Sequence, residues 1–91
     1  MARINLTFSR ALADVKDNKV ILDVKDVKDL LSILDNRYGE RFKEKFYDEN
    51  RRPKRFINIF VNGVEIRSLN GLDTIFKDND NVVILPVVTG G

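Results

Sequence analysis

Apolar and polar residues alternate in two short stretches near the start of the chain, residues 4–8 and 20–24. Successive side chains of a strand point to opposite faces, so this alternation predicts two strands that each have one buried face. The polar stretch between them, residues 9–18, has a length that suits a loose hairpin. We therefore expect the chain to begin with a pair of strands.

The spacing of apolar residues then changes to three or four, which is the spacing of an amphipathic helix. The residues with this spacing are Val27, Leu30, Leu31, Leu34 and Tyr38. Asp26 is suited to cap the start of the helix, and Gly39 is suited to end it. Phe42, Phe46 and Tyr47 then predict a further short helical turn before a charged loop over residues 48–55.

The second half of the chain predicts strands and turns only. Strands are expected over residues 56–61 and 64–66, because Asn62-Gly63 between them supplies the positive φ angles of a two-residue hairpin turn. A short stretch over residues 72–76 and a polar turn over residues 77–81 come before the last apolar run, residues 82–88. This run is apolar at both parities, which is typical of a strand in the middle of a sheet.

The order strand, strand, helix, strand, strand, strand predicts an α+β fold, for which a β-grasp is the economical arrangement. Its mixed sheet would have about five strands, with the first and last strands parallel at the centre and the helix on one face. The residues expected to face the helix are Ile4, Leu6, Phe8, Val20, Leu22, Ile57, Ile59, Val61, Val82 and Ile84.

The opposite parity predicts apolar residues on the face that the helix leaves uncovered. These residues are Phe56, Phe60, Val83, Leu85 and Val87. Scattered surface hydrophobic residues are common and are one interpretation. A docking surface for a partner is the sharper one, because two phenylalanine rings fall on the same face.

Composition limits the chemistry. The chain has 91 residues, 43% hydrophobic and 33% charged, which suits a single domain spanning residues 1–91. Cysteine and histidine are both absent, so thiolate nucleophiles, imidazole bases and the usual zinc ligands are missing. We therefore expect a carrier or binding module without a bound cofactor or metal, rather than an enzyme.

Charge and hydropathy give no sign of nucleic acid or membrane as a partner. The formal charge is only +2, and the basic stretch over residues 51–55 has no interleaved aromatic residue. Asp78-Asn79-Asp80 is similar to the start of a calcium loop, but Val83 and Thr89 stand where that loop needs glycine and glutamate. No apolar run approaches the roughly 18 residues that a membrane helix needs. A cytoplasmic protein is the simplest expectation.

The chain ends on Thr89-Gly90-Gly91, and this ending carries the most specific chemistry. Glycine has no Cβ, so its backbone passes through a channel that is too narrow for side chains. The reactive group at this end is the carboxylate of Gly91, which must be activated, for example as an acyl-adenylate, before a nucleophile can take it. We expect a flexible tail over about residues 87–91 that presents this carboxylate to an enzyme.

Several stretches resemble the small subunit of molybdopterin synthase and its relatives, the ubiquitin-like β-grasp sulfur carriers of the ThiS and MoaD type. They are FINIFVNG at residues 56–63, GLDT at 71–74, KDND at 77–80 and LPVVTGG at 85–91. The similarity is strong across residues 56–91 and is one of pattern only in the first half, where Phe8-Ser9-Arg10 resembles the family's first strand and loop.

The resemblance implies a sulfur-transfer route that runs through the C-terminus. A MoeB/ThiF-like adenylyltransferase, similar to the ubiquitin-activating enzyme and holding zinc and ATP, would adenylate Gly91, and sulfur transfer would leave a thiocarboxylate there. The large subunit of molybdopterin synthase would use this sulfur to build the dithiolene of the molybdenum cofactor. By position, Gly90 and Thr89 would thread the partner's active site, while Leu85 and Phe60 would contribute to the apolar interface.

Two alternatives remain open from the sequence. The stretch FVNGVEIRSLNGLDT also resembles archaeal ubiquitin-like modifiers and carriers of other pathways, such as cysteine synthesis, thiamin synthesis or tRNA thiolation. A modifier would use the same adenylation but would transfer the Gly91 carbonyl to a lysine of a target protein. A ubiquitin-fold interaction module whose glycines are never activated is the other alternative.

Overall fold

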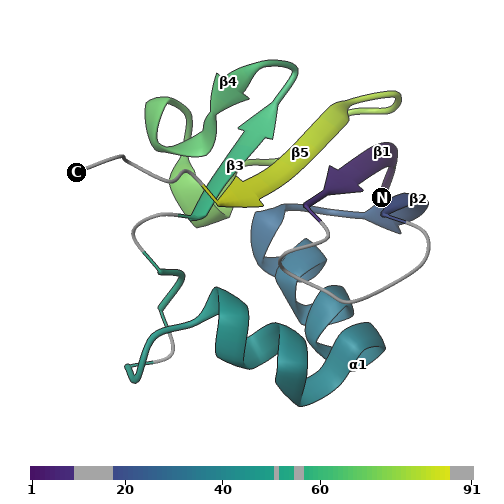
Figure 1. Cartoon of the computed structure of the whole chain (residues 1–91). Helices are drawn as coiled ribbons and strands as arrows, with labels where there is room; N and C mark the ends of the chain where they lie inside the picture. Colours follow the sequence, from purple (N-terminus) through teal and green to yellow (C-terminus); the bar gives the residue numbers. More distant parts are fainter. Residues whose placement is uncertain (10–17, 51, 55–56, 87–91) are drawn as a thin grey trace.

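The computed structural model describes residues 1–9, 18–50, 52–54 and 57–86. The elements run in the predicted order of strands and helix, with two additional 3-10 helices (Figure 1). They are β1 (Ala2–Phe8), β2 (Lys19–Val24), α1 (Val27–Phe46), β3 (Ile57–Val61), β4 (Val64–Glu65), η1 (Ile66–Ser68), η2 (Gly71–Asp73) and β5 (Asn81–Pro86).

The strands form one five-stranded mixed sheet in the order β2-β1-β5-β3-β4. β1 pairs parallel with β5, with Leu6 opposite Val82, and antiparallel with β2. β3 lies on the other side of β5 and pairs antiparallel with both β5 and β4. The prediction that the first and last strands lie parallel at the centre is therefore confirmed. Strands lie on both sides of β5, so its predicted place in the middle of the sheet is confirmed.

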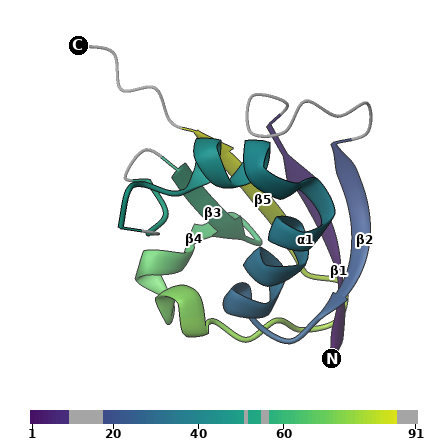
Figure 2. The ribbon, with the colours of Figure 1, turned by 90° about the horizontal axis from the view of Figure 1, so that it is seen from below.

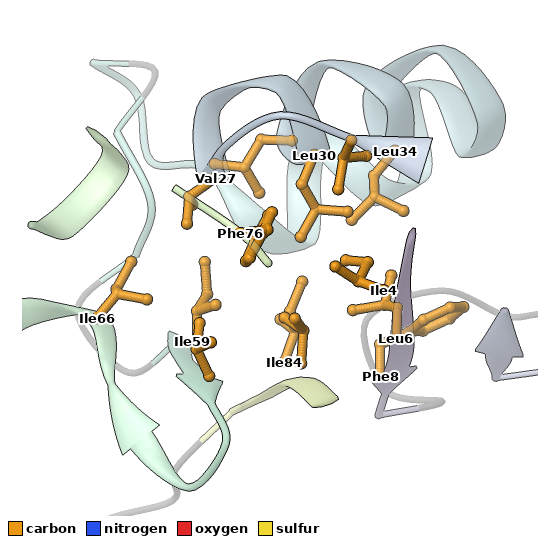
Figure 3. Close-up of a cluster of buried hydrophobic side chains, with 14 of the residues drawn as sticks. Ile4, Leu6, Phe8, Val27, Leu30, Leu34, Ile59, Ile66, Phe76 and Ile84 are labelled. Carbon is orange, nitrogen blue, oxygen red and sulfur yellow. The ribbon is translucent and has the colours of Figure 1, made fainter. Parts of the chain in front are cut away.

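The hydrophobic core lies between α1 and one face of this sheet (Figures 2 and 3). The residues predicted to face the helix on β1, β3 and β5 are buried, between 0% and 7% exposed. Val20 and Leu22 are only partly buried because β2 is an edge strand. From α1 the buried residues are Val27, Leu30, Leu31, Leu34, Phe42 and Phe46.

Helix α1 begins and breaks at the residues that the sequence indicates. The Asp26 side chain accepts a hydrogen bond from the Asp29 N–H at 2.9 Å, which caps the first turn. Gly39 interrupts the helix with φ 71° and ψ −151°, a conformation that is essentially restricted to glycine. The helix resumes beyond it, and the stacked rings of Phe42 and Phe46, 5.0 Å apart, extend the core.

Two segments of the second half differ in detail from the expectation. The strand predicted over residues 64–66 ends at Glu65, because Ile66 turns into η1 and is buried. Residues 71–73 form η2, and Ile75 makes an isolated bridge with Asp26. The hairpin turn between β3 and β4 has the predicted positive φ angles, 51° at Asn62 and 85° at Gly63.

The polar turn before β5 is held by side-chain hydrogen bonds. Asp80 is buried and accepts hydrogen bonds from the Asn62 amide at 2.9 Å and from the Lys77 N–H at 2.8 Å. These bonds give the Asp80 carboxylate a structural role. Among the described residues there is no cluster of three or more acidic, histidine or cysteine side chains suited to a metal ion. No described helix is both long enough and apolar enough to cross a membrane.

Candidate functional site

Strand β5 leads directly to the predicted tail. Its pairing with β3 extends further toward the tail than its pairing with β1. On the β1 side, pairing ends where the Ser9 N–H donates to the Ile84 carbonyl at 3.0 Å. On the β3 side, pairing continues until Pro86 lies opposite Ile57. Proline has no N–H to offer, so Pro86 is a natural end of the ladder. The start of the tail is thus fixed to the central strand of the sheet.

Beside this strand end lies a group of apolar side chains on the face that α1 does not cover. Phe60 on β3 lies directly opposite Val83 on β5, and Leu85 lies two residues further along β5. All of these side chains are half-buried, whereas their chain neighbours Ile59 and Ile84 are 3% and 0% exposed on the helix side. The predicted parity is therefore confirmed for these residues, and Phe60, Val83 and Leu85 are called the β3–β5 patch below.

A polar cluster that the sequence did not single out borders this patch. The Arg67 guanidinium donates to the Asn58 side chain at 3.2 Å and to the Ile57 carbonyl at 3.4 Å, and it pairs with Glu65 at 2.9 Å. Asn58 is the residue that lies opposite Leu85. The patch is therefore bordered by an Arg67–Glu65 ion pair and the Asn58 side chain, beside the strand end that leads to the tail. In the sequence, only the position of Arg67 just after a hairpin could have drawn attention to it.

The other predicted site residues lie outside the part of the chain that the structure describes. These are Phe56, Val87, Thr89, Gly90 and Gly91. Their assigned roles, at the apolar interface and in the tail, stay predictions. The structure brings together the described members of the interface, Phe60 and Leu85, on adjacent strands of one face.

Groups with shifted pKa values lie elsewhere in the molecule. Burial raises the pKa of the Tyr47 hydroxyl, and the nearby Asp35 carboxylate, which accepts its hydrogen bond at 3.3 Å, raises it further. The hydrogen bond to Asp73, 2.6 Å away, raises the pKa of the Lys28 ammonium, and the negative charge of Asp73 adds to this shift. Both groups therefore keep their protons at neutral pH, so these positions offer no general base there.

Tyr47 and Asp35 also line a broad surface hollow of about 1050 Å³ beside the second part of α1. The remaining lining residues are Glu40, Lys43, Glu44, Asp48, Glu49, Asn50 and Lys54. The lining thus mixes both signs of charge, and none of it comes from β3 or β5. The strand end and its patch are the better candidate site, because β5 ends at Pro86, directly before the predicted diglycine tail in the sequence.

Comparison with known proteins finds similarity over nearly the whole chain. The model of the ThiS family matches residues 6–91. The sulfur carrier protein CysO of Mycobacterium tuberculosis (strain ATCC 25618 / H37Rv) is 51% identical over 37 residues, which cover 41% of this chain and 40% of that protein. The match thus spans about two fifths of the length of this curated relative.

Solved structures with the same fold cover the full length. The small archaeal modifier protein 1 (SAMP1) of Methanosarcina acetivorans superimposes with a TM-score of 0.78 and 33% identity, over 100% of this chain and 98% of that one. A chain of the Amycolatopsis orientalis BexX/CysO complex has a TM-score of 0.78 and 26% identity, over 97% and 99%. The mixed sheet with one helix is therefore the β-grasp fold of ubiquitin-like proteins.

Proposed function

This chain belongs to the ThiS family, and we propose that it is a sulfur carrier that holds sulfur as a C-terminal thiocarboxylate on Gly91. The observation that carries the proposal is the family match, which extends through the diglycine to residue 91. The fold supports it, because the tail follows directly from the central strand and its origin is fixed at Pro86. The reacting group is a main-chain carboxylate, so no cysteine or histidine of this chain is required.

The proposed reaction has two steps. The Gly91 carboxylate attacks the α-phosphorus of ATP on an adenylyltransferase, which forms the acyl-adenylate and releases pyrophosphate. A sulfur donor then attacks the carbonyl carbon and AMP leaves, so that one carboxylate oxygen is replaced by sulfur. Thr89 and Gly90 would thread the partner's active site, and the two terminal glycines need little width there because they have no side chain.

We propose that the β3–β5 patch docks these partner enzymes. A partner that covers Phe60 and Leu85 gains roughly 1.5 to 3 kcal/mol for each side chain it fully buries, before the cost of association. Phe56 and Val87 would extend the same surface toward the tail. The BexX/CysO complex supports this idea, since its name shows that a carrier with this fold assembles with another protein.

The large subunit of molybdopterin synthase is the sulfur recipient that we propose, on the basis of the resemblance of residues 56–91 to its small subunit. Enzymes of cysteine synthesis, thiamin synthesis and tRNA thiolation are the competing recipients. To distinguish these recipients, the thiocarboxylate form of the chain is incubated with each class of enzyme. The enzyme that removes the sulfur identifies the recipient. Unchanged thiocarboxylate in the presence of an active molybdopterin synthase large subunit would redirect the proposal to another recipient.

A second function, protein modification, is favoured by a specific similarity. The chain is 33% identical to small archaeal modifier protein 1 over its full length. The same adenylate would then react with the amino group of a lysine, AMP would leave, and an isopeptide bond would join Gly91 to the target. Both functions require the activation step, so a chain that is not adenylated would have neither function.

Activation is tested by intact-protein mass spectrometry. The chain is incubated with ATP, an adenylyltransferase of the MoeB/ThiF type from the same organism, and sulfide as the sulfur donor. We expect the mass to rise by the difference between one sulfur and one oxygen atom. Deletion of Gly91 should abolish the rise, whereas Lys45→Ala, an exposed change on α1, should leave it intact.

The mass of the full chain could instead stay unchanged with an adenylyltransferase that converts another carrier. That result would exclude both the sulfur carrier and the protein modifier, and the interaction module would be the remaining hypothesis. Circular dichroism of the Gly91 deletion should match the full chain, because residues 87–91 follow the last strand.

A further inference from the structure

Strand β2 forms an open edge of the sheet, on the side away from β4 (Figure 2). The hydrogen bonds of β1 show which backbone N–H and C=O groups of β2 point toward β1 and which point away from the sheet. The Phe8 N–H donates to the Asn18 carbonyl at 3.0 Å, so by alternation Val20, Leu22 and Val24 bond toward β1. The Asn5 N–H correspondingly turns to the other side and donates to Asp80 at 2.9 Å. The N–H and C=O groups of Lys19, Ile21 and Asp23 therefore point outward.

In the part of the chain that the structure describes, no strand pairs with this outer edge. The side chains of Lys19, Ile21 and Asp23 all lie on the face that α1 leaves uncovered, and all are exposed. Ile21 stands at the centre with 67% of its surface accessible, among the most exposed large hydrophobic residues described. An exposed apolar residue in the middle of an open strand edge is a template for pairing with another strand.

We propose that β2 pairs with β2 of a second copy of this chain, antiparallel and centred on Ile21. On a two-fold axis at this residue, Ile21 lies opposite its own counterpart, and Lys19 of each copy lies opposite Asp23 of the other. The outward N–H and C=O groups then meet in hydrogen-bonded pairs, which gives about six main-chain hydrogen bonds. The two sheets join into one continuous sheet with closed two-fold symmetry.

The charges on β2 select the second copy over an arbitrary strand. Among the residues of β2, opposite charges face each other on the same side of the sheet only in the register centred on Ile21, where both Lys19–Asp23 contacts form at once. A shift of two residues along the strand places each charge opposite Ile21 or beyond the strand. A shift of one residue turns the outward backbone groups away from each other. The edge is thus self-complementary in one register.

The existing contacts of these side chains leave room for the pairing. Arg3 holds one carboxylate oxygen of Asp23 at 3.3 Å, and both side chains of this pair are more than half exposed, 70% and 58%. The second oxygen of Asp23 can therefore accept a bond from Lys19 of the other copy. β1 separates β2 from β5, so the β3–β5 patch and the strand end that leads to the tail stay free in the dimer. The proposal does not depend on sulfur transfer.

A single strand pair buries little surface, so the dimer is expected to be weak and reversible. Sedimentation velocity from about 10 μM to about 1 mM covers the range in which small interfaces associate. The average mass should rise from the 10.5 kDa of the monomer toward twice that value. Lys19→Asp and Asp23→Lys each place like charges opposite each other, so each should weaken self-association at least about tenfold.

Mixing the two variants provides the decisive control. The acidic and the basic variant complement each other in the proposed register, so their mixture should dimerise more strongly than either variant alone. Arg41→Glu is the control: it is an exposed substitution on α1 that changes the net charge by the same amount as Lys19→Asp. It should leave self-association at the wild-type level. Amide hydrogen exchange measured by NMR should slow with concentration at Lys19, Ile21 and Asp23 and not at Val20 and Leu22.

Any one of three outcomes would overturn the proposal. One is a wild-type chain that stays monomeric up to about 1 mM. Another is a dimer that the charge variants leave unchanged but Phe60→Ala abolishes, since this result would place the contact on the β3–β5 patch. Failure of the mixed variants to associate, with each variant folded by circular dichroism, would also exclude the register.

Discussion

The two faces of the sheet use adjacent residues of the same strands in different ways. On β5, Ile84 is 0% exposed beneath α1, whereas Val83 and Leu85 on either side point to the uncovered face and are half-buried. On β3, Ile59 and Phe60 show the same contrast. The residues on both faces are apolar, so the faces differ in whether α1 packs against them. We infer that the covered face stabilises the fold and the uncovered face serves contacts with other molecules.

The largest expected effect comes from the covered face. Ile84→Ala should lower the free energy of unfolding by about 2 to 5 kcal/mol, because it removes buried methyl groups and leaves a cavity in the centre of the core. Urea denaturation followed by circular dichroism measures this change. Val83→Ala is the matched control one residue away and should cost clearly less. Equal losses of unfolding free energy for the two variants would mean that the two faces of the sheet are equally buried.

A smaller effect is expected at Gly39, where α1 is interrupted and then continues over the core. Gly39→Ala should lower the free energy of unfolding by about 1 to 3 kcal/mol, because its φ of 71° and ψ of −151° are strained for any residue with a Cβ. The break lets Phe42 and Phe46 continue the core. Thermal unfolding measures the loss, with the exposed helix substitution Asn36→Ala as the control. A more stable Gly39→Ala variant would show that the break is not required.

The smallest change in folding is expected on the uncovered face. Phe60→Ala should cost about 1 kcal/mol of unfolding free energy, since the ring is already partly exposed and loses only part of a full burial. Its affinity for the adenylyltransferase should fall at least about tenfold, as for a hot-spot aromatic residue at the centre of an interface. Isothermal titration calorimetry gives the affinity, with Ile59→Val as the partner-neutral control. Unchanged affinity would remove Phe60 from the docking surface.

Much of this contrast is predictable from the sequence, because strand parity is a local property. Alternation along residues 4–8 predicts which residues of β1 face the helix once one helix and one sheet are assumed, and the two-sided apolar run of β5 predicts its place in the middle of the sheet. Asn62-Gly63 fixes the register of β3 and β4 through the geometry of its turn. Asp26 and Gly39 likewise act through their own backbone neighbourhoods, so both were recognisable in advance.

The features that depend on contacts between distant segments were not predictable. Arg67 binds Asn58 and Ile57, and Asn62 binds Asp80, only after the strands have come together. β4 ends early because the Glu65 carboxylate accepts the Arg67 N–H and starts η1, which a period-of-two pattern does not indicate. The outward edge of β2 also needed the observed hydrogen bonds, since the sequence alone leaves open which parity bonds to β1.

The parallel pairing of β1 with β5 has a consequence for how the protein is made. Leu6 and Val82 meet at the centre of the sheet although nearly the whole chain lies between them. During synthesis, β1 and α1 leave the ribosome early, but the sheet cannot close until Pro86 has emerged as well. A nascent chain that is interrupted before Asn81 lacks the strand to which both β1 and β3 pair. A complete sheet therefore shows that translation has passed through the last strand.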